Sequence, residues 1–227
     1  MLAPVHFSEL TPPELRVLGC LIEKRWTTPD HYPLSLNALR LACNQSTNRD
    51  PVTDYDEDTV REAAQRLSRY GLARLASGHS SRSVKYRHLA EEGLGLDREE
   101  LAVLAVLLLR ASQTPGELKA RSERMAPIGS LDKVEQVLET LIDRGYARRI
   151  GRRPGQKEDR FVHLLGDSGE ADLAVAEAEV GTQPQAVTVA ETLDHGPSLL
   201  ERIAALEDEM AALRLEVAEL RAERDAR

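Results

Sequence analysis

The segment TPPELRVLGCLIEKRWTTP, at positions 11–29, has a second copy in DREELAVLAVLLLRASQTP, at positions 97–115, at a constant offset of 86 residues. In both segments leucine recurs at three- and four-residue spacing, which is typical of the buried face of an amphipathic helix. In the second copy, Thr114 is expected to cap the next helix, with Pro115 at its first position. The chain is therefore expected to contain one structural unit twice.

The remainder of each copy follows the same order. VREAAQRLSRYGLAR, which begins at Val60, aligns with VEQVLETLIDRGYAR, which begins at Val134, at an offset of 74 residues. A shorter helix is expected before each of these third helices, at positions 35–43 and 115–123. Each copy then closes on a related segment, YRHL in the first and FVHL in the second.

A glycine, Gly71 in the first copy and Gly145 in the second, is expected to end the third helix by supplying a left-handed residue. After it come a short strand, a polar turn and a second strand. Three helices closed by a β-hairpin form the winged-helix variant of the helix-turn-helix. We therefore predict a mainly α fold with small β-hairpins (α+β), with tandem winged-helix domains at positions 1–90 and 91–165. Such small units are expected to pack together.

Four motifs resemble the YceH-like family of bacterial proteins: LIEKRWTTPDHYPLSLNALRLACNQSTNRDPV, VKYRHL, QTPGELKARSERM and PGQKEDRFVHLL. Because they occur in order over positions 8–165, the resemblance is highly specific. It implies a tandem winged-helix fold and a bacterial cytoplasmic setting. It implies no activity and no set of site residues, so these must be argued from the residues themselves.

The composition changes after position 165. Residues 166–197 are acidic and rich in alanine, which is typical of a flexible, solvated linker. Positions 198–227 carry apolar residues at alternating steps of four and three, a heptad pattern that predicts a coiled-coil helix. Opposite charges at the flanking positions favour a parallel homodimer over a helix that docks on its own domain or pairs with another protein. The expected dimerisation residues are Leu199, Ile203, Leu206, Met210, Leu213, Val217 and Leu220.

Charge and cysteine usage limit the cellular setting. The formal net charge is −8, but positions 166–227 carry −10 and the first 165 residues carry +2. The N-terminus lacks the pattern of a signal peptide, and the longest apolar run, at positions 101–109, is too short to span a bilayer. Cys20 and Cys43 lack CxxC spacing and are expected to be buried thiols, which fits the reducing cytoplasm.

The motifs of common enzyme classes are absent from the sequence. It has no GxSxG, no HExxH, no phosphate-binding GxxxxGKS or GxxxxGKT and no Rossmann glycine fingerprint. We therefore expect a non-enzymatic protein without catalytic residues, a metal site or a cofactor. The aromatic content of 4% disfavours single-stranded nucleic acid as a partner, because such binding uses aromatic stacking platforms.

The first copy offers the better surface for reading duplex DNA. Winged-helix proteins usually place the third helix in the major groove and the hairpin on the backbone. The third helix is acidic in the second copy, whereas in the first it presents Arg61, Gln65, Arg66 and Arg69. The turn before it is longer in the first copy, and its side chains suit phosphates and base edges but equally suit helix caps and turns. The candidates in this turn are Asn44, Gln45, Ser46, Asn48 and Arg49.

Each hairpin, at positions 72–88 and 146–163, carries a net charge of +4. Such hairpins suit salt-sensitive contacts with DNA phosphates, unless they are simply solvated or paired with acids of the neighbouring domain. The expected phosphate-binding residues are Arg82, Lys85 and Arg87 in the first hairpin and Arg148, Arg149, Arg152, Arg153 and Lys157 in the second.

These observations favour a transcription-regulator-like protein that binds duplex DNA. The alternative is an interaction scaffold that binds another protein and no DNA. The acidic third helix of the second copy and the overall negative charge favour this alternative.

Overall fold

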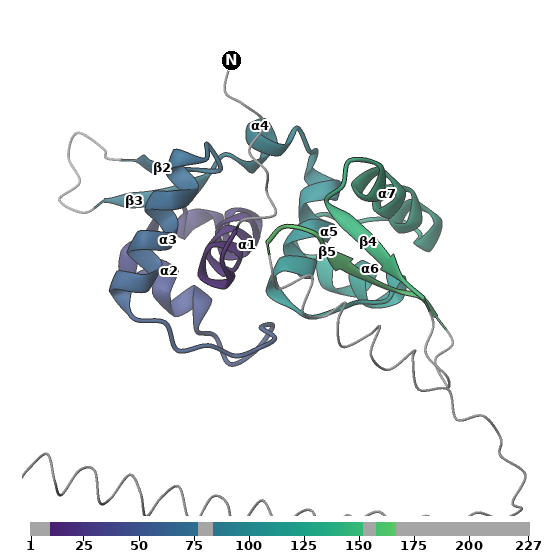
Figure 1. Cartoon of the computed structure of the whole chain (residues 1–227), viewed down its shortest axis with the longest axis horizontal. Coiled ribbons are helices and arrows are strands. Elements are labelled where there is room, and N and C mark those ends of the chain that lie inside the picture. Colours follow the sequence, from purple (N-terminus) through teal and green to yellow (C-terminus); the bar gives the residue numbers. More distant parts are fainter. Residues whose placement is uncertain (1–9, 77–83, 152–157, 167–227) are drawn as a thin grey trace, which may run out of the picture. The chain divides into compact units, whose positions relative to one another are not determined.

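A computed structural model describes residues 10–76, 84–151 and 158–166, which form a mixed α+β fold with small antiparallel sheets (Figure 1). The first copy comprises α1 (Pro12–Thr27), the 3-10 turn η2 (Pro29–His31), β1 (Leu34–Ser35), α2 (Leu36–Cys43), α3 (Glu57–Arg69), β2 (Ala73–Ala76) and β3 (Lys85–His88). A short helix, α4 (Ala90–Leu94), leads to the second copy. That copy comprises α5 (Arg98–Leu109), α6 (Pro115–Ser122), α7 (Leu131–Asp143), β4 (Ala147–Ile150) and β5 (Arg160–His163).

Local chemistry sets the helix ends where the sequence indicated. Thr114 Oγ1 accepts a hydrogen bond from the Glu117 backbone N–H at 3.3 Å, and Pro115 is the first residue of α6, as predicted. Gly71 and Gly145 follow the ends of α3 and α7 with φ angles of 73° and 75°. A residue with a Cβ atom is strained in this left-handed conformation, whereas glycine adopts it readily. The prediction that a glycine ends each of these helices is confirmed.

The sheet of the first copy has one more strand than the sequence analysis expected. Strands β2 and β3 form the predicted hairpin, and β1 pairs with the other edge of β3, with Leu34 opposite Tyr86. In the second copy, β4 and β5 form the two-stranded hairpin, and a single bridge joins Gln113 to Phe161. The extra strand lies in the longer segment that precedes α2 in the first copy.

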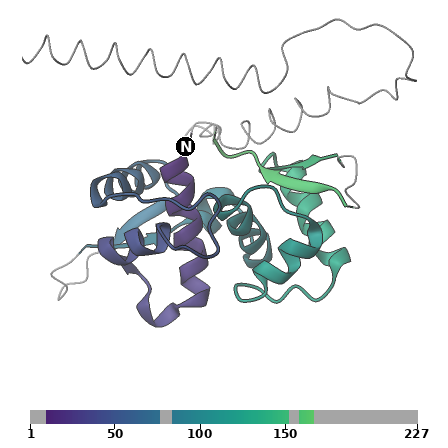
Figure 2. The same cartoon turned by 90° about the horizontal axis from the view of Figure 1, so that it is seen from below.

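The two copies pack together along α1 and α5, which lie side by side in both views (Figures 1 and 2). Their buried side chains belong to one continuous hydrophobic core, as the small size of each unit predicts. Gly19 lies where the helices approach closely, because a Cβ atom there would be 2.9 Å from Cγ of Leu109. A glycine in the middle of α1 therefore permits this close packing.

Helix α4 was not expected, and the division placed after residue 90 falls inside it. Gly93 of this helix lies against the end of α3, since a Cβ atom there would be 3.1 Å from the Gly71 carbonyl oxygen. At its other end, the Leu94 carbonyl accepts a 3.1 Å hydrogen bond from the Tyr146 hydroxyl of the second copy. The connection between the copies is thus a packed helix.

Candidate nucleic-acid interface

The polar turn between α2 and α3 is held together largely by its own side chains. The Asn44 amide nitrogen donates to the Tyr55 carbonyl at 2.7 Å, and its Oδ1 accepts from the Tyr55 N–H at 2.9 Å. Gln45 Oε1 accepts from Lys24 Nζ at 3.3 Å. The amides of Asn44 and Gln45 therefore stabilise the turn, whereas Ser46 and Asn48, of the predicted contacts here, have exposed side chains.

Arg49 is not available to a nucleic acid, which corrects its assignment as a phosphate contact. Its side chain is 0% exposed and forms two hydrogen bonds with the Glu23 carboxylate, Nη1 to Oε1 at 3.2 Å and Nη2 to Oε2 at 2.7 Å. It also donates to the Ala42 and Asn48 carbonyls at 2.9 and 2.7 Å and to Gln45 Oε1 at 2.9 Å. A guanidinium satisfied in this way holds the turn onto α1 and α2.

The same turn reaches across to the second copy. The Asp50 backbone N–H donates to the Leu109 carbonyl at the end of α5, at 2.9 Å. The next residue, Arg110, donates to Oδ1 of Asn48, which is a predicted contact residue. The buried Arg16 of α1 donates to the Pro51 carbonyl at 2.6 Å and completes the attachment. The turn is therefore a structural bridge between the copies.

Helix α3 keeps two of its four predicted contact residues free. Arg61 pairs with Asp58 and lies 3.8 Å from Glu57, both in the acidic first turn of the same helix. Arg66 Nε lies 2.6 Å from the buried carboxylate of Glu14. Gln65 and Arg69, by contrast, are exposed and have no hydrogen-bond or ion-pair partner among the residues that the structure describes.

The first hairpin presents unpaired cations on its exposed face. Arg74 of β2 lies directly opposite Arg87 of β3, and both are exposed. Because alternate residues of a strand share a face, Lys85 points to the same side, while Tyr86 and His88 are buried on the other. Within the described residues, no acid pairs with these three cations. Arg74 was not among the residues named as contacts, and Arg82 lies outside the described residues.

The second hairpin is different, because acids pair with two of its described cations. Arg149 pairs with Glu139 of α7, lies 3.8 Å from Asp159, and stacks with its guanidinium 5.4 Å from the centre of the Phe161 ring. Arg160 lies 3.1 Å from Glu117. These acids all belong to the second copy itself, whereas the alternative that the sequence left open was pairing with acids of the neighbouring domain. Arg148 is exposed, and Arg152, Arg153 and Lys157 lie outside the described residues.

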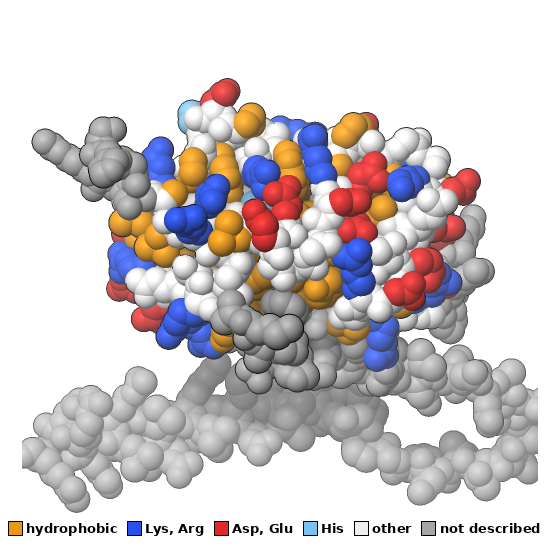
Figure 3. Space-filling model, turned by 90° about the horizontal axis from the view of Figure 1, so that it is seen from above, with side chains coloured by type: hydrophobic (Ala, Val, Ile, Leu, Met, Phe, Trp, Pro, Cys, Tyr) orange, Lys and Arg blue, Asp and Glu red, His pale blue; other side chains and the backbone are white. Residues whose placement is uncertain are grey.

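On the face drawn in Figure 3, the cations and acids of the described residues are interspersed. A family model described as "Protein of unknown function, DUF480" matches residues 10–156, which include most of both copies. The chain belongs to the DUF480 family. A UPF0502 protein of Serratia proteamaculans is 43% identical over 210 residues, covering 89% of this chain and 91% of the relative. Another of Geotalea uraniireducens is 49% identical over 219 residues, covering 96% and 94%.

Membership of DUF480 confirms the resemblance to a bacterial family without an assigned activity. The names of these relatives state no ligand or reaction. The chemistry of the candidate site therefore has to be argued from the side chains of this chain.

The two cysteines of this DUF480 chain are buried free thiols, as predicted. Cys20 Sγ donates to the Ala42 carbonyl at 3.3 Å. A hydrogen bond with the Cys20 thiol, together with burial, raises the pKa of the Cys43 thiol. Among the described residues, no group of three or more His, Cys, Asp or Glu side chains is placed to hold a metal ion.

None of the described helices is both long and apolar enough to cross a membrane. The predicted linker at 166–197, apart from Gly166, and the predicted coiled coil at 198–227 lie outside the described residues. The dimerisation residues named above lie in this C-terminal part of the chain.

Proposed function

We propose that this chain is a non-enzymatic, tandem winged-helix protein that binds duplex DNA through its first copy. In this proposal, the elements from α1 to β3 form one winged helix and those from α5 to β5 form the other, because each set has three helices followed by a hairpin. It also assigns residues 198–227 to a parallel coiled coil that makes the protein a homodimer. Two symmetry-related first copies would then meet two half-sites on a duplex.

The facing pair of Arg74 and Arg87 supports this proposal most. Like charges directly opposite each other on two strands are destabilising, so this exposed pair, which meets no acid among the described residues, has an unfavourable interaction energy. A phosphate lying between two guanidiniums removes this repulsion. In the equivalent hairpin of the second copy, Arg149 and Arg160 are paired with Glu139, Asp159 and Glu117, so these two cations are less available to a phosphate.

The proposed contact surface therefore differs from the one that the sequence indicated. It comprises Gln65 and Arg69 of α3 and Arg74, Lys85 and Arg87 of the hairpin, and it excludes Arg49. Helix α3 supplies an amide and a guanidinium for base edges or phosphates, and the hairpin supplies cations for the backbone.

Fluorescence anisotropy of a labelled duplex, measured from about 50 to about 200 mM salt, tests this proposal. The double variant Arg74→Gln/Arg87→Gln is expected to bind more weakly and to reduce the salt slope by about two, one for each lost phosphate contact. The matched control, Arg149→Gln/Arg160→Gln, removes two paired cations and should leave the slope unchanged. Equal slopes in the two double variants, or no saturable binding at low salt, would refute the proposal.

A protein-binding scaffold is the competing function, and α7 is the feature that favours it. Its surface carries exposed Asp132, Glu135 and Asp143, and Leu131 at its start is 48% exposed. Recovery of one stoichiometric partner with the full chain, lost on Leu131→Asp, together with no DNA retention, would select this function. Retention of duplex DNA that depends on Arg74 and Arg87 would select the first.

A further inference from the structure

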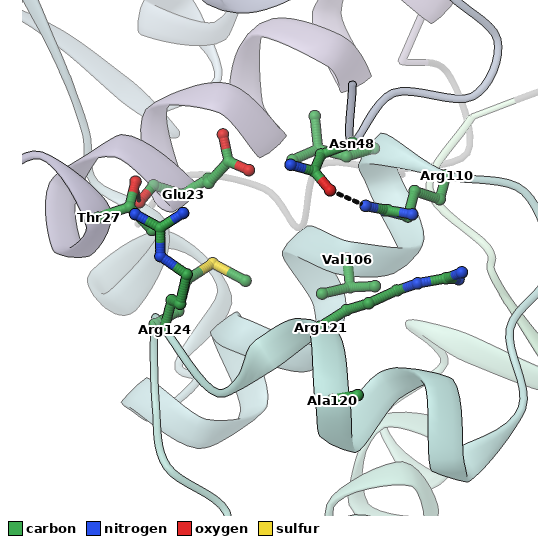
Figure 4. A pocket seen from close by; sticks show the side chains of 10 residues that line it. Glu23, Thr27, Asn48, Val106, Arg110, Ala120, Arg121 and Arg124 are labelled. Atoms are coloured by element: carbon green, nitrogen blue, oxygen red, sulfur yellow. Dashed lines mark hydrogen bonds between the residues drawn. The ribbon is translucent and has the colours of Figure 1, made fainter. Parts of the chain in front are cut away.

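A cleft between the two copies has a chemistry that the DNA-binding surface does not use. The cavity has a volume of about 190 Å³ and lies between α1, α5, α6 and the polar turn (Figure 4). This volume corresponds to about six water molecules in the liquid, so the cavity suits a small molecule. Its lining residues are Glu23, Thr27, Asn48, Val106, Leu109, Arg110, Ala120, Arg121, Arg124 and Met125.

Three arginines contribute to this cleft from separate positions along the chain. Arg110 follows the end of α5, Arg121 lies in the last turn of α6, and Arg124 lies in the turn after α6. In Figure 4, Arg110 and Arg121 lie on one side of the cleft and Arg124 lies on the other, beside Thr27. The three arginines therefore line the cleft from two sides.

The acids near the cleft leave much of this positive charge uncompensated. The Glu23 carboxylate is already bound by Arg49, and Lys24 Nζ lies 3.4 Å from it. Glu117 lies 3.4 Å from Arg121 but also pairs with Arg160 at 3.1 Å.

The other two arginines of the cleft pair with no acid in the part of the chain that the structure describes. Arg110 donates to the neutral Asn48 amide oxygen, and Arg124 is exposed, with no ion pair to any described residue. Burial, followed by the like charges of Arg121 and Arg49, lowers the pKa of the Arg110 guanidinium. A bound anion would relieve this repulsion between like charges.

We infer that this cleft binds a small phosphorylated compound, whose anionic oxygens contact Arg110 and Arg121 on one side of the cleft and Arg124 on the other. A guanidinium presents a planar fork of donors that matches phosphate oxygens, and three of them complement a doubly negative group. The side chains of Val106 and Met125 give part of the wall an apolar surface for the carbon portion of the ligand. The inference does not depend on the proposed DNA binding.

A ligand in this position would connect the two copies. Asn48 and Glu23 belong to the first copy, whereas the three arginines belong to the second. A molecule that binds the folded protein and not the unfolded chain raises the unfolding temperature. The compound is therefore expected to fix the first copy against the second.

Calorimetric titration of inorganic pyrophosphate into the full chain, in a phosphate-free buffer at low salt, tests the inference. Saturable binding is expected, with a rise in unfolding temperature. Arg124→Gln should raise the Kd about tenfold, which is the loss expected for one charge-assisted contact. The control is Lys133→Gln, which removes an exposed cation of α7 that does not line the cleft and should change the Kd less than about twofold.

A second ligand and a second variant sharpen the test. Glycerol phosphate should displace pyrophosphate, and Arg121→Gln combined with Arg124→Gln should abolish binding while the circular dichroism spectrum stays that of the wild type. Absence of saturable binding, or a Kd indifferent to Arg124→Gln, would overturn the inference. An equal loss in Lys133→Gln would also overturn it, because the anion would then respond to surface charge in general and not to the cleft.

Discussion

Replacement of Arg49 by methionine should destabilise the fold strongly, because this arginine is a buried structural cation. The change keeps most of the side-chain volume but removes the donors that bind Glu23, two backbone carbonyls and Gln45. Burial alone would raise the pKa of the Glu23 carboxyl, but hydrogen bonding and attraction from Arg49 outweigh it and lower that pKa. In Arg49→Met the carboxylate would remain, mostly buried, without its main partner.

The size of the effect follows from this geometry. Breaking a buried ion pair by removing one partner costs about 3–5 kcal/mol of the free energy of unfolding. For a folded unit of this size, such a loss lowers the unfolding temperature by about 6–20 °C. Adding Glu23→Gln removes the uncompensated charge, so the double variant should be more stable than the sum of the single changes predicts, by about 0.5–3 kcal/mol.

Urea titrations followed by circular dichroism, with differential scanning calorimetry, measure these quantities for the wild type, both single variants and the double variant. Arg69→Met is the matched control, because that side chain is exposed and unpaired, and it should change the free energy of unfolding by less than about 0.5 kcal/mol. If Arg49→Met unfolds within about 1 kcal/mol of the wild type, Arg49 does not carry the structural role assigned to it.

Three further predictions concern helix packing, pH and assembly. Gly19→Ala should lower the free energy of unfolding, since overpacking against Leu109 costs about 1–3 kcal/mol and exceeds the gain in helix propensity. The control is Gly116→Ala in α6, where the added Cβ atom would be 4.0 Å from Oγ1 of Thr114 and should not destabilise the protein. If denaturant titrations show equal losses in the free energy of unfolding for both variants, the packing argument for Gly19 is contradicted. Burial lowers the pKa of His163 from 6.5 to about 4, so the unfolded chain takes up its proton first as the pH falls. The free energy of unfolding should therefore be highest above pH 6.5 and should fall as the pH drops toward 4. This fall should be less steep in His163→Gln. If the free energy of unfolding depends on pH with the same slope in both proteins, the role assigned to His163 is wrong. Removal of residues 198–227 should convert a dimer into a monomer by light scattering, and an unchanged oligomeric state would rule out the proposed coiled coil.

The helices and the hairpins were predictable because their signals are local. Leucine spacing, the capping threonine at Thr114 and the terminating glycines Gly71 and Gly145 each act within a few residues of their own position. The internal repeat then indicated that the same order of elements occurs twice. Strand β1 and helix α4 were missed because each is very short and packs against residues distant in sequence.

The candidate site was less predictable, because a sequence shows where cations occur but not which acids they meet. Arg66 and Arg69 are neighbours on one helix, yet Arg66 meets Glu14 of α1 and Arg69 is exposed. The arginines of the cleft gave no signal at all, since Arg110 and Arg124 are separated along the chain and gather only when α5 and α6 pack.

By itself, the sequence determined a repeated unit of three helices and a hairpin, together with the burial of its two cysteines. Periodicity and capping dictate such features through contacts between near neighbours. The tertiary structure alone decided that Arg49 is internal, that the polar turn joins the two copies, and that Arg74 and Arg87 remain unpaired among the described residues. The physical reason is that the charge available at a surface depends on partners brought close by folding, and those partners lie tens of residues away in the chain.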